Sequence, residues 1–144
     1  MAHPLAIRSI HHLCLTVTDV TRSRAFYTNL LGFDVAAEMP PPSDPAYDAV
    51  NAILFGGVVL IKGPLLLGLR PVAPHGDRFD EDRVGLDHLS FSVGSRDELA
   101  EAARFLEEHG IAHGPITDLP SFGIYILEFR DPDNIQLELT APHA

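Results

Sequence analysis

Two segments of this chain repeat each other position by position. Residues 12–17 read His-Leu-Cys-Leu-Thr-Val, and residues 88–93 read His-Leu-Ser-Phe-Ser-Val. In both copies apolar residues alternate with polar ones, which is typical of a strand with one buried and one exposed face. A repeat constrains the fold strongly, because both copies are expected to form the same supersecondary unit.

A helical pattern follows each predicted strand. Helices are expected over residues 20–31 and 96–109, and each is followed directly by a glycine, which suits the left-handed position after a helix. Ser95 and Glu98 have the Ser-x-x-Glu spacing of a capping box at the start of the second helix. Further strands are expected to open at residues 33–35 and 111–113.

Each half then ends in a hairpin. The paired runs are 58–62 with 65–70 in the first half, and 124–129 with 135–140 in the second. The second pair flanks an Asp-Pro-Asp-Asn turn, in which Asn134 tolerates the left-handed conformation. The sequence therefore predicts an α+β fold of paired βαβββ modules. We expect one domain of 144 residues, with module one at about 7–71, a linker at 72–83 and module two at about 84–141.

Two stretches of module one do not fit the repeat. Residues 39–48 are rich in proline and are expected to form an excursion or lid. Residues 49–55 are ambiguous, and are interpreted either as an extra strand or as the start of a longer strand broken at Gly56 and Gly57.

Three potential metal ligands lie on the polar sides of the predicted strands. His12 and His88 are equivalent in the repeat, and Glu138 occupies the polar side of the last strand. If the polar faces of the modules meet, the three side chains converge in one cleft. Two imidazoles and a carboxylate form the facial triad of non-haem Fe(II) enzymes, and a carboxylate among apolar residues is costly to bury unless it is paired or coordinated. The competing interpretation is that each histidine is an ordinary hydrogen-bonded strand residue.

Composition excludes several classes of function. Ten Lys and Arg against twenty Asp and Glu give a net charge of −10, which disfavours nucleic-acid binding. The single cysteine, Cys14, allows neither an internal disulfide nor a cysteine-built zinc site. No apolar run reaches the roughly 20 residues of a membrane span, and the first residues lack a signal-peptide pattern, so we expect a cytoplasmic protein.

Four segments together resemble the vicinal oxygen chelate superfamily, which includes glyoxalase I, extradiol dioxygenases, fosfomycin-resistance transferases and bleomycin-resistance proteins. The segments that carry the resemblance are 10–19, 23–27 with 31–33, 85–93 and 129–138. The resemblance implies that the paired βαβββ modules form a curled mixed sheet around a metal cleft, with a divalent metal on His12, His88 and Glu138. It also implies pairing of modules within or between chains, for which we expect a homodimer. Fe2+ is the favoured ion, and Mn2+, Zn2+, Ni2+ or Co2+ would also suit the ligands.

One departure from the family pattern bears on the reaction. The position on the last strand of module one that often carries a fourth ligand is Gly68 here, which has no side chain to coordinate. This argues against a four-ligand, glyoxalase I-like site and favours the three-ligand pattern of extradiol dioxygenases and fosfomycin-resistance transferases. The favoured function is a metal-dependent enzyme, a dioxygenase or lyase, that acts on a small oxygen-chelating substrate, with dioxygenase-like chemistry preferred.

Other residues are candidates for substrate binding and proton transfer. Glu138 counts with the catalytic groups as a ligand, and Tyr125 and His113 are unranked candidates for a proton shuttle. Cys14 and Ser90 are expected to line the pocket, and Arg130 could clamp a substrate carboxylate or pair with Asp131 or Glu128 at the surface. The alternative functions are a bleomycin-resistance-type binding protein and a fosfomycin-type thiol transferase.

Overall fold

The computed structural model describes residues 4–144, so the first residues, on which the expectation of no signal peptide rests, lie outside them. The chain divides into two compact units, and the second runs from Asp77 to Ala144. The boundary falls inside the stretch 72–83 that was expected as a linker. Among the described residues, no helix is both long and apolar enough to cross a membrane.

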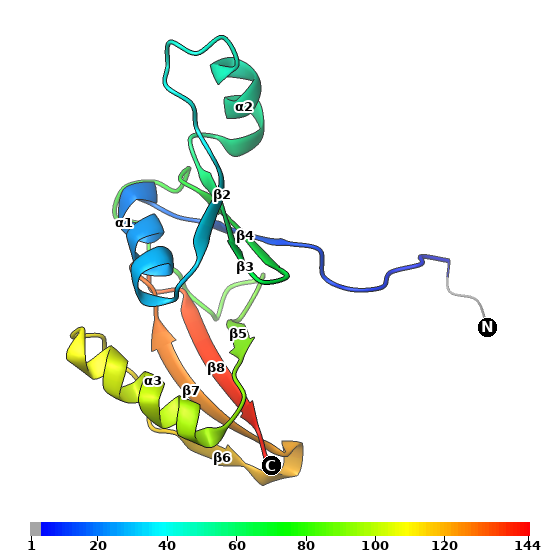
Figure 1. The fold of residues 1–144 in the computed structure, drawn as a ribbon, viewed down its shortest axis with the longest axis vertical. Coiled ribbons are helices and arrows are strands. Elements are labelled where there is room, and N and C mark those ends of the chain that lie inside the picture. Colours follow the sequence, from blue (N-terminus) through cyan, green and yellow to red (C-terminus); the bar gives the residue numbers. More distant parts are fainter. Residues whose placement is uncertain (1–3) are drawn as a thin grey trace. The chain divides into compact units, whose positions relative to one another are not determined.

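The first unit is a four-stranded sheet whose helices come between the strands in chain order (Figure 1). The strand order is β1-β4-β3-β2, with β1 parallel to β4 and the other neighbours antiparallel. Its elements are β1 (Leu13–Thr16), α1 (Val20–Ala25), the π-helical turn η1 (Phe26–Leu30), β2 (Asp34–Glu38), α2 (Tyr47–Leu54), β3 (Val58–Lys62) and β4 (Leu65–Arg70).

The second unit repeats this topology. The strand order is β5-β8-β7-β6, and β5 is parallel to β8 as β1 is to β4. Its elements are β5 (Leu89–Ser92), α3 (Arg96–Glu108), β6 (Thr117–Leu119), the 3-10 turn η2 (Pro120–Phe122), β7 (Ile124–Arg130) and β8 (Gln136–Pro142). The predicted α+β fold of two βαβββ modules is confirmed, as two separate four-stranded sheets.

Each unit has its own core between its sheet and its helix. In the first unit Leu15, Val17, Leu60, Leu67 and Leu69 are buried together with Tyr27 and Phe26 of the helical turn. In the second unit Leu99 and Leu106 of α3 are buried with Leu127, Phe129 and Leu137. The alternation along the repeat segments therefore has the expected cause, because the apolar side of each strand faces a helix.

Residues 49–54 lie in a helix, so both strand interpretations of this stretch are wrong. Phe55 caps helix α2, adopts the left-handed conformation with φ of 54° and donates its backbone N–H to the backbone oxygen of Asn51. Figure 1 shows α2 beyond the β2–β3 end of the sheet, and none of its residues is buried. Ala, Asn and Leu in this run favour a helical turn over an extended strand where no neighbouring strand is available.

Two smaller expectations also need correction. Residues 111–113 form no strand, and His113 makes only an isolated bridge to Phe129 before β6 starts at Thr117. Pro115 lies between them and lacks the N–H that a ladder needs. At the start of α3, Ser95 accepts from the N–H of Glu98 as expected, but the Glu98 carboxylate accepts from Gly94 N–H.

The register of the parallel strands makes the two units directly comparable. Cys14 lies opposite Gly68 in the first unit, and Ser90 lies opposite Glu138 in the second. Gly68 therefore occupies the position that Glu138 has in the second unit, as the sequence alignment predicted. A Cβ at Gly68 would lie 2.7 Å from Sγ of Cys14, which is too close for an ordinary contact.

This contact predicts a coupled pair of substitutions. Gly68→Ala should lower the free energy of unfolding in the presence of Cys14, because Sγ must move away from the new methyl group. In a Cys14→Ala background the nearest remaining atom would be Cβ at 3.6 Å, so Gly68→Ala should be neutral or stabilising by up to about 1 kcal/mol. Urea unfolding of the four variants measures the coupling, and additive effects would contradict it.

Candidate functional site

Glu138 is the buried carboxylate of β8. Only 7% of the residue is exposed, although its neighbours along the strand are apolar. Thr140 donates a hydrogen bond to Oε1 of Glu138 at 2.9 Å, and the hydroxyls of Ser90 and Thr140 are also hydrogen-bonded. Because the Thr140 hydroxyl has one proton, Ser90 donates to Thr140, which donates to Glu138. These contacts satisfy one carboxylate oxygen and leave Oε2 for another partner.

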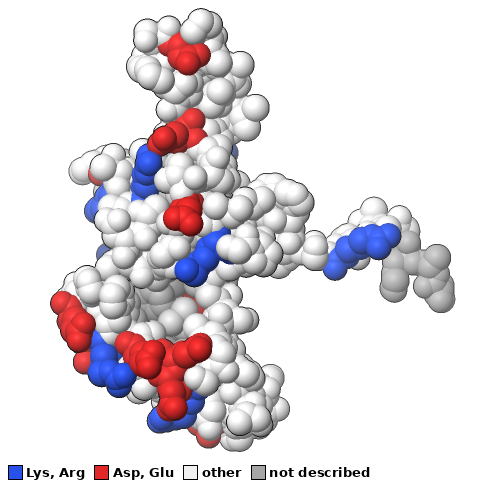
Figure 2. All heavy atoms as spheres, in the orientation of Figure 1, with Lys and Arg blue, Asp and Glu red and all other residues white. Residues whose placement is uncertain are grey.

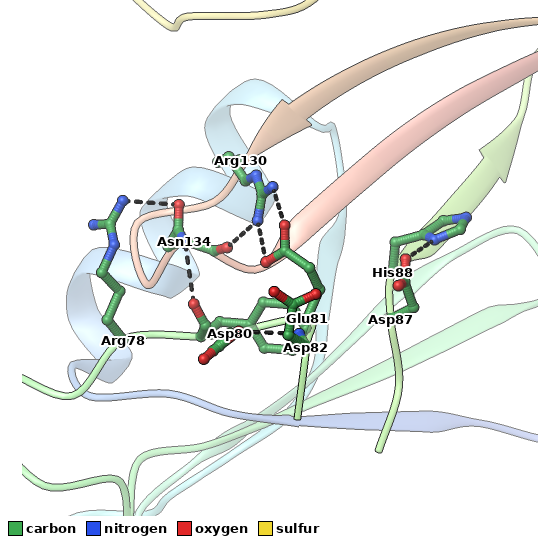
Figure 3. A network of polar contacts seen from close by, with 9 residues as sticks. Arg78, Asp80, Glu81, Asp82, Asp87, His88, Arg130 and Asn134 are labelled. Atoms are coloured by element: carbon green, nitrogen blue, oxygen red, sulfur yellow. Dashed lines mark hydrogen bonds and ion pairs between the residues drawn. The ribbon is translucent and has the colours of Figure 1, made fainter. Parts of the chain in front are cut away.

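His88 immediately precedes β5 and is oriented by the residue before it. Its Nδ1 lies 2.6 Å from Oδ1 of Asp87, an acceptor, so Nδ1 bears the proton and the neutral ring presents its lone pair at Nε2 (Figure 3). The hydrogen bond to Asp87 raises the pKa of His88 above its ordinary value, and the Glu138 carboxylate adds to the effect. A carboxylate on one ring nitrogen is the usual arrangement of a metal-binding histidine.

His88 and Glu138 lie close enough to share a divalent ion after a small movement. Nε2 of His88 lies 4.0 Å from Oε2 of Glu138, which is too long for a hydrogen bond. Two ligands with bonds of about 2.0–2.2 Å to one ion, at an angle of roughly 90–110°, lie about 3.0–3.5 Å apart, so the two side chains would approach each other by less than about 1 Å when they bind it. Within residues 4–144, no group of three His, Cys, Asp or Glu side chains forms a complete metal site. The second unit therefore provides two of the three predicted ligands as a pair.

The third predicted ligand belongs to the first unit. His12 immediately precedes β1, as His88 precedes β5, and it is exposed. Its Nδ1 lies 2.9 Å from Nδ1 of His11, and the two rings meet edge to face. Cys14, expected to line the pocket, follows on the same polar side of β1 and is also exposed.

Tyr125 and His113 are not brought together with Glu138. Glu128 is the register partner of Glu138, and Tyr125, three residues away on the same strand, points to the opposite face of the sheet. There it lies under Arg96 of α3, with 5.8 Å from the guanidinium to the ring centre. His113 contacts Glu107 of α3 at 2.9 Å, on this same side. We call this side of the second sheet the helix face, and we call the opposite side, which carries Glu138, the Glu138 face.

Arg130 lies on the Glu138 face, and Glu81 occupies its guanidinium. The two groups form a bidentate ion pair with distances of 2.7 and 3.1 Å (Figure 3). Arg130 also donates to the backbone oxygen of Asn134. Neither partner proposed from the sequence is the one seen here, because Glu81 is 49 residues away and its pairing depends on how the linker folds.

The linker docks onto the turn between β7 and β8. Asn134 has a φ of 68° and donates from its side chain to the backbone oxygen of Phe79, while Arg78 donates to the Asn134 side-chain oxygen. Phe79 N–H donates to the oxygen of Asp133. The left-handed Asn134 expected from the turn sequence is confirmed, and this conformation supports the contacts that hold the linker.

Glu128 was missed by the sequence reasoning. It is exposed on the Glu138 face, directly across from Glu138 in the register of β7 and β8. Its carboxylate contributes electrostatically to the raised pKa values of both His88 and Arg130. Counting alternate residues back from Arg130 in the predicted hairpin would have found it.

The corresponding face of the first unit has no carboxylate at these two positions. Gly68 stands in the place of Glu138, and its antiparallel partner is Val59 where the second unit has Glu128. Leu66 and Ile61 continue this surface, while the charged residues Arg70 and Asp34 lie further out on it. The directly opposed pair of carboxylates therefore distinguishes the second sheet from the first.

The Glu81–Arg130 pair predicts a pH dependence of stability. The hydrogen bonds from Arg130 lower the pKa of Glu81 from 4.5 to about 2. A carboxylate whose pKa is lower in the folded state stabilises the fold above pH 4.5, and this contribution is lost as the pH falls toward 2. The difference in unfolding free energy between wild type and Glu81→Gln should be constant above pH 4.5 and vanish near pH 2.

Urea unfolding across this pH range is the measurement, with Glu108→Gln on α3 as the matched carboxylate control. Figure 2 shows that acidic side chains gather around α3, so this control tests general charge effects at the surface. A difference between wild type and Glu81→Gln that does not change with pH would contradict the ion pair.

Comparison with known proteins identifies the family. A model of the glyoxalase/bleomycin resistance protein/dioxygenase superfamily matches residues 9–139. An uncharacterised protein, YwkD of Bacillus subtilis (strain 168), is 34% identical over 94% of this chain and 98% of its own length. Catechol-2,3-dioxygenase of the same organism is 29% identical over 88% of this chain, which corresponds to 39% of that enzyme.

A solved structure agrees with these matches. The crystal structure of a glyoxylase/bleomycin resistance protein/dioxygenase domain from Frankia sp. EAN1pec has a TM-score of 0.73 and 30% identity, and covers 95% of this chain and 93% of that one. Because the family model spans nearly the whole chain and the fold agrees, this protein belongs to the glyoxalase/bleomycin resistance protein/dioxygenase superfamily.

Proposed function

We propose that this protein is a divalent-metal-dependent enzyme acting on a small substrate that chelates through two oxygens. The ion would be held by His88 and Glu138 together with His12. The observation that carries the proposal is the arrangement Asp87–His88–Glu138, in which one nitrogen of His88 is fixed by a carboxylate and the other faces a buried, half-satisfied carboxylate. Thr140 satisfies only one oxygen of the buried Glu138, and a bound cation would offset the remaining cost of burying its charge among apolar neighbours.

The residues of the second unit would prepare the site for binding. Asp87 fixes the tautomer of His88, and Thr140 fixes one oxygen of Glu138. The bound ion would polarise the substrate oxygens as a Lewis acid. Ser90 lies beside Glu138 on the neighbouring strand, where its hydroxyl could meet a bound substrate. Fe2+ is the favoured ion, with Mn2+, Zn2+, Ni2+ or Co2+ as alternatives.

Within the superfamily we favour dioxygenase-like chemistry. Gly68 leaves the site with three protein ligands and open coordination positions, as non-haem Fe(II) oxygenases require. The similarity to a catechol-2,3-dioxygenase supports the same subclass. A lyase remains the nearest alternative within the enzyme class. Tyr125 and His113 stay predictions as proton shuttles, and their position on the helix face does not support them.

A binding protein of the bleomycin-resistance type is the alternative from another class. Such a protein needs no metal, so its ligand positions would be free to vary. The paired His88 and Glu138 favour the enzyme, because a purely sequestering surface has no need of a buried carboxylate.

Removal of one ligand tests the metal site. His88→Ala should abolish stoichiometric metal while the protein stays folded, because His88 is exposed and the core lies on the other side of the sheet. The wild type should bind about one ion per chain. Elemental analysis after reconstitution measures metal content, and circular dichroism checks the fold.

His109→Ala at the end of α3 is the matched control, since this histidine is also exposed and hydrogen-bonds only the preceding helical turn. It should keep the wild-type metal content. A wild type that takes up no metal, or a His88→Ala variant with unchanged content, would refute the proposed site.

We further propose a homodimer, in which His12 could come from the partner's copy of the first unit. Co-expression of His12→Ala chains with Glu138→Ala chains tests this exchange. If His12 is supplied in trans, each mixed dimer contains one intact site, so metal content should return to about a quarter of wild type. Either variant alone should bind none.

No recovery of metal in dimers shown to be mixed would place His12 in the same chain as His88 and Glu138. A monomer in solution at micromolar concentration would contradict the homodimer itself. Native mass spectrometry distinguishes these outcomes, because it reports both the chain composition and the bound metal.

A further inference from the structure

We infer that Glu128 determines which substrates the site accepts, by favouring neutral molecules that bear hydroxyl groups over dianions such as phosphonates. The inference rests on the proposed metal site and goes beyond it, because it names the substrate class. It assigns a specificity role to a residue that is not one of the metal ligands.

The geometry places Glu128 beside the substrate positions of that site. Ser90, Glu138 and Glu128 are consecutive register partners across β5, β8 and β7, so their side chains form one row on the Glu138 face. Directly opposed residues of an antiparallel pair have Cβ atoms roughly 5 Å apart. A molecule held by an ion on His88 and Glu138 would therefore lie within reach of the Glu128 carboxylate.

The Glu128 carboxylate is free to meet a ligand. Its side chain forms no hydrogen bond or ion pair within residues 4–144, and it is exposed. Arg130 lies two residues further along the same face, but Glu81 and the oxygen of Asn134 occupy its guanidinium. The nearby cation that could neutralise Glu128 is thus already used elsewhere.

The fold gains nothing from this pair of carboxylates. Like charges directly opposed across two strands destabilise a sheet. The first unit has the same topology and the same register, and it places Gly68 and Val59 at these positions. A sheet of this kind therefore folds without the charges, and their presence in the second unit points to a role in binding.

Charge arithmetic gives the direction of selection. A divalent ion with the Glu138 carboxylate has a net charge of +1, which the Asp87 carboxylate on His88 reduces to zero, so the Glu128 carboxylate makes the local sum negative. A dianion gains little attraction from such a site and is repelled by Glu128 at short range. A neutral diol or hydroxyketone avoids this repulsion, and its hydroxyl can donate a charge-assisted hydrogen bond to Glu128.

This selection separates the functions considered above. It favours hydroxycarbonyl substrates, and catechols that keep one hydroxyl proton to donate to Glu128, and it disfavours a fosfomycin-type transferase, whose substrate carries a phosphonate. Arg130 cannot compensate while its guanidinium is held by Glu81 in a bidentate pair.

The test compares two probes on protein loaded with Zn2+, which is redox-inactive. Isothermal titration calorimetry would measure the Kd of hydroxyacetone, which can coordinate through its carbonyl and hydroxyl oxygens and stay neutral, and of methylphosphonate at a pH where it is a dianion. In Glu128→Gln, the affinity for methylphosphonate should rise about tenfold or more, because one repulsive charge is removed. The affinity for hydroxyacetone should fall several-fold, because a neutral amide accepts a weaker hydrogen bond.

Three controls keep the result specific. Glu101→Gln on α3 removes an equal charge from an exposed helix position and should leave both affinities unchanged. Glu128→Asp keeps the charge and should retain most of the wild-type discrimination. Zinc content is measured on every sample, and Glu128→Gln should match the wild type.

The inference is overturned if Glu128→Gln discriminates between the probes as the wild type does. It is also overturned if Glu128→Gln loses zinc, since Glu128 would then be a ligand. A wild type that binds no zinc refutes the metal site, and the specificity role with it. Metal content and probe affinity therefore separate a failure of the site from a failure of the specificity role.

Discussion

The burial of a carboxylate in the middle of a parallel strand pair dominates the chemistry of this protein. Glu138 lies on β8 between Leu137 and Leu139, and a charge in such a place requires partners. Thr140, which accepts from Ser90, donates to one oxygen, and His88, held by Asp87, approaches the other. The contacts among Ser90, Thr140, His88 and Asp87 are therefore arranged around this one unfavourable placement.

The internal repeat shows how one topology supports two different surfaces. Both units use a β-strand that runs parallel to its own final strand, and both bury the apolar side of that pair under a helix. The residues that determine the fold lie on the buried side, and this side is similarly apolar in both units. The opposite side is free to differ, and it is apolar around Gly68 and acidic around Glu138. This division lets one half of a duplicated fold specialise without loss of its core.

Much of the fold could be predicted from local patterns, because the patterns and the packing agree. The alternation in residues 12–17 and 88–93 identified both strand pairs, and the hairpin of β3 and β4 has the predicted ends. The prediction for residues 49–55 was wrong because this apolar run pairs with no strand, so nothing in the tertiary structure favours an extended conformation over the local preference for a helix.

Part of the candidate site could also be predicted from the sequence. Repeat equivalence and strand parity predicted that His88 and Glu138 lie together, and they are 4.0 Å apart, while their role as metal ligands stays a prediction. Tyr125 was chosen by residue type, although its position along the strand places it on the opposite face from Glu128. The Arg130–Glu81 pair depends on a loop 49 residues away, and no periodicity reports such a contact. The odd or even position of a residue along a strand therefore predicts which face of the sheet carries its side chain. The partners that loops contribute to a site are seen only in the structure.

The close approach of Cys14 to Gly68 has a consequence for how such proteins diversify. A side chain at position 68 meets Sγ of Cys14 before it reaches anything else. A lineage that acquires a carboxylate at position 68 while Cys14 is present would lose stability at that step. If Cys14 is first replaced by a smaller residue, the same acquisition has room. A fourth protein ligand at position 68 can thus be acquired without loss of stability only after Cys14 has been replaced. The Sγ atom of Cys14 therefore determines the order of the two substitutions.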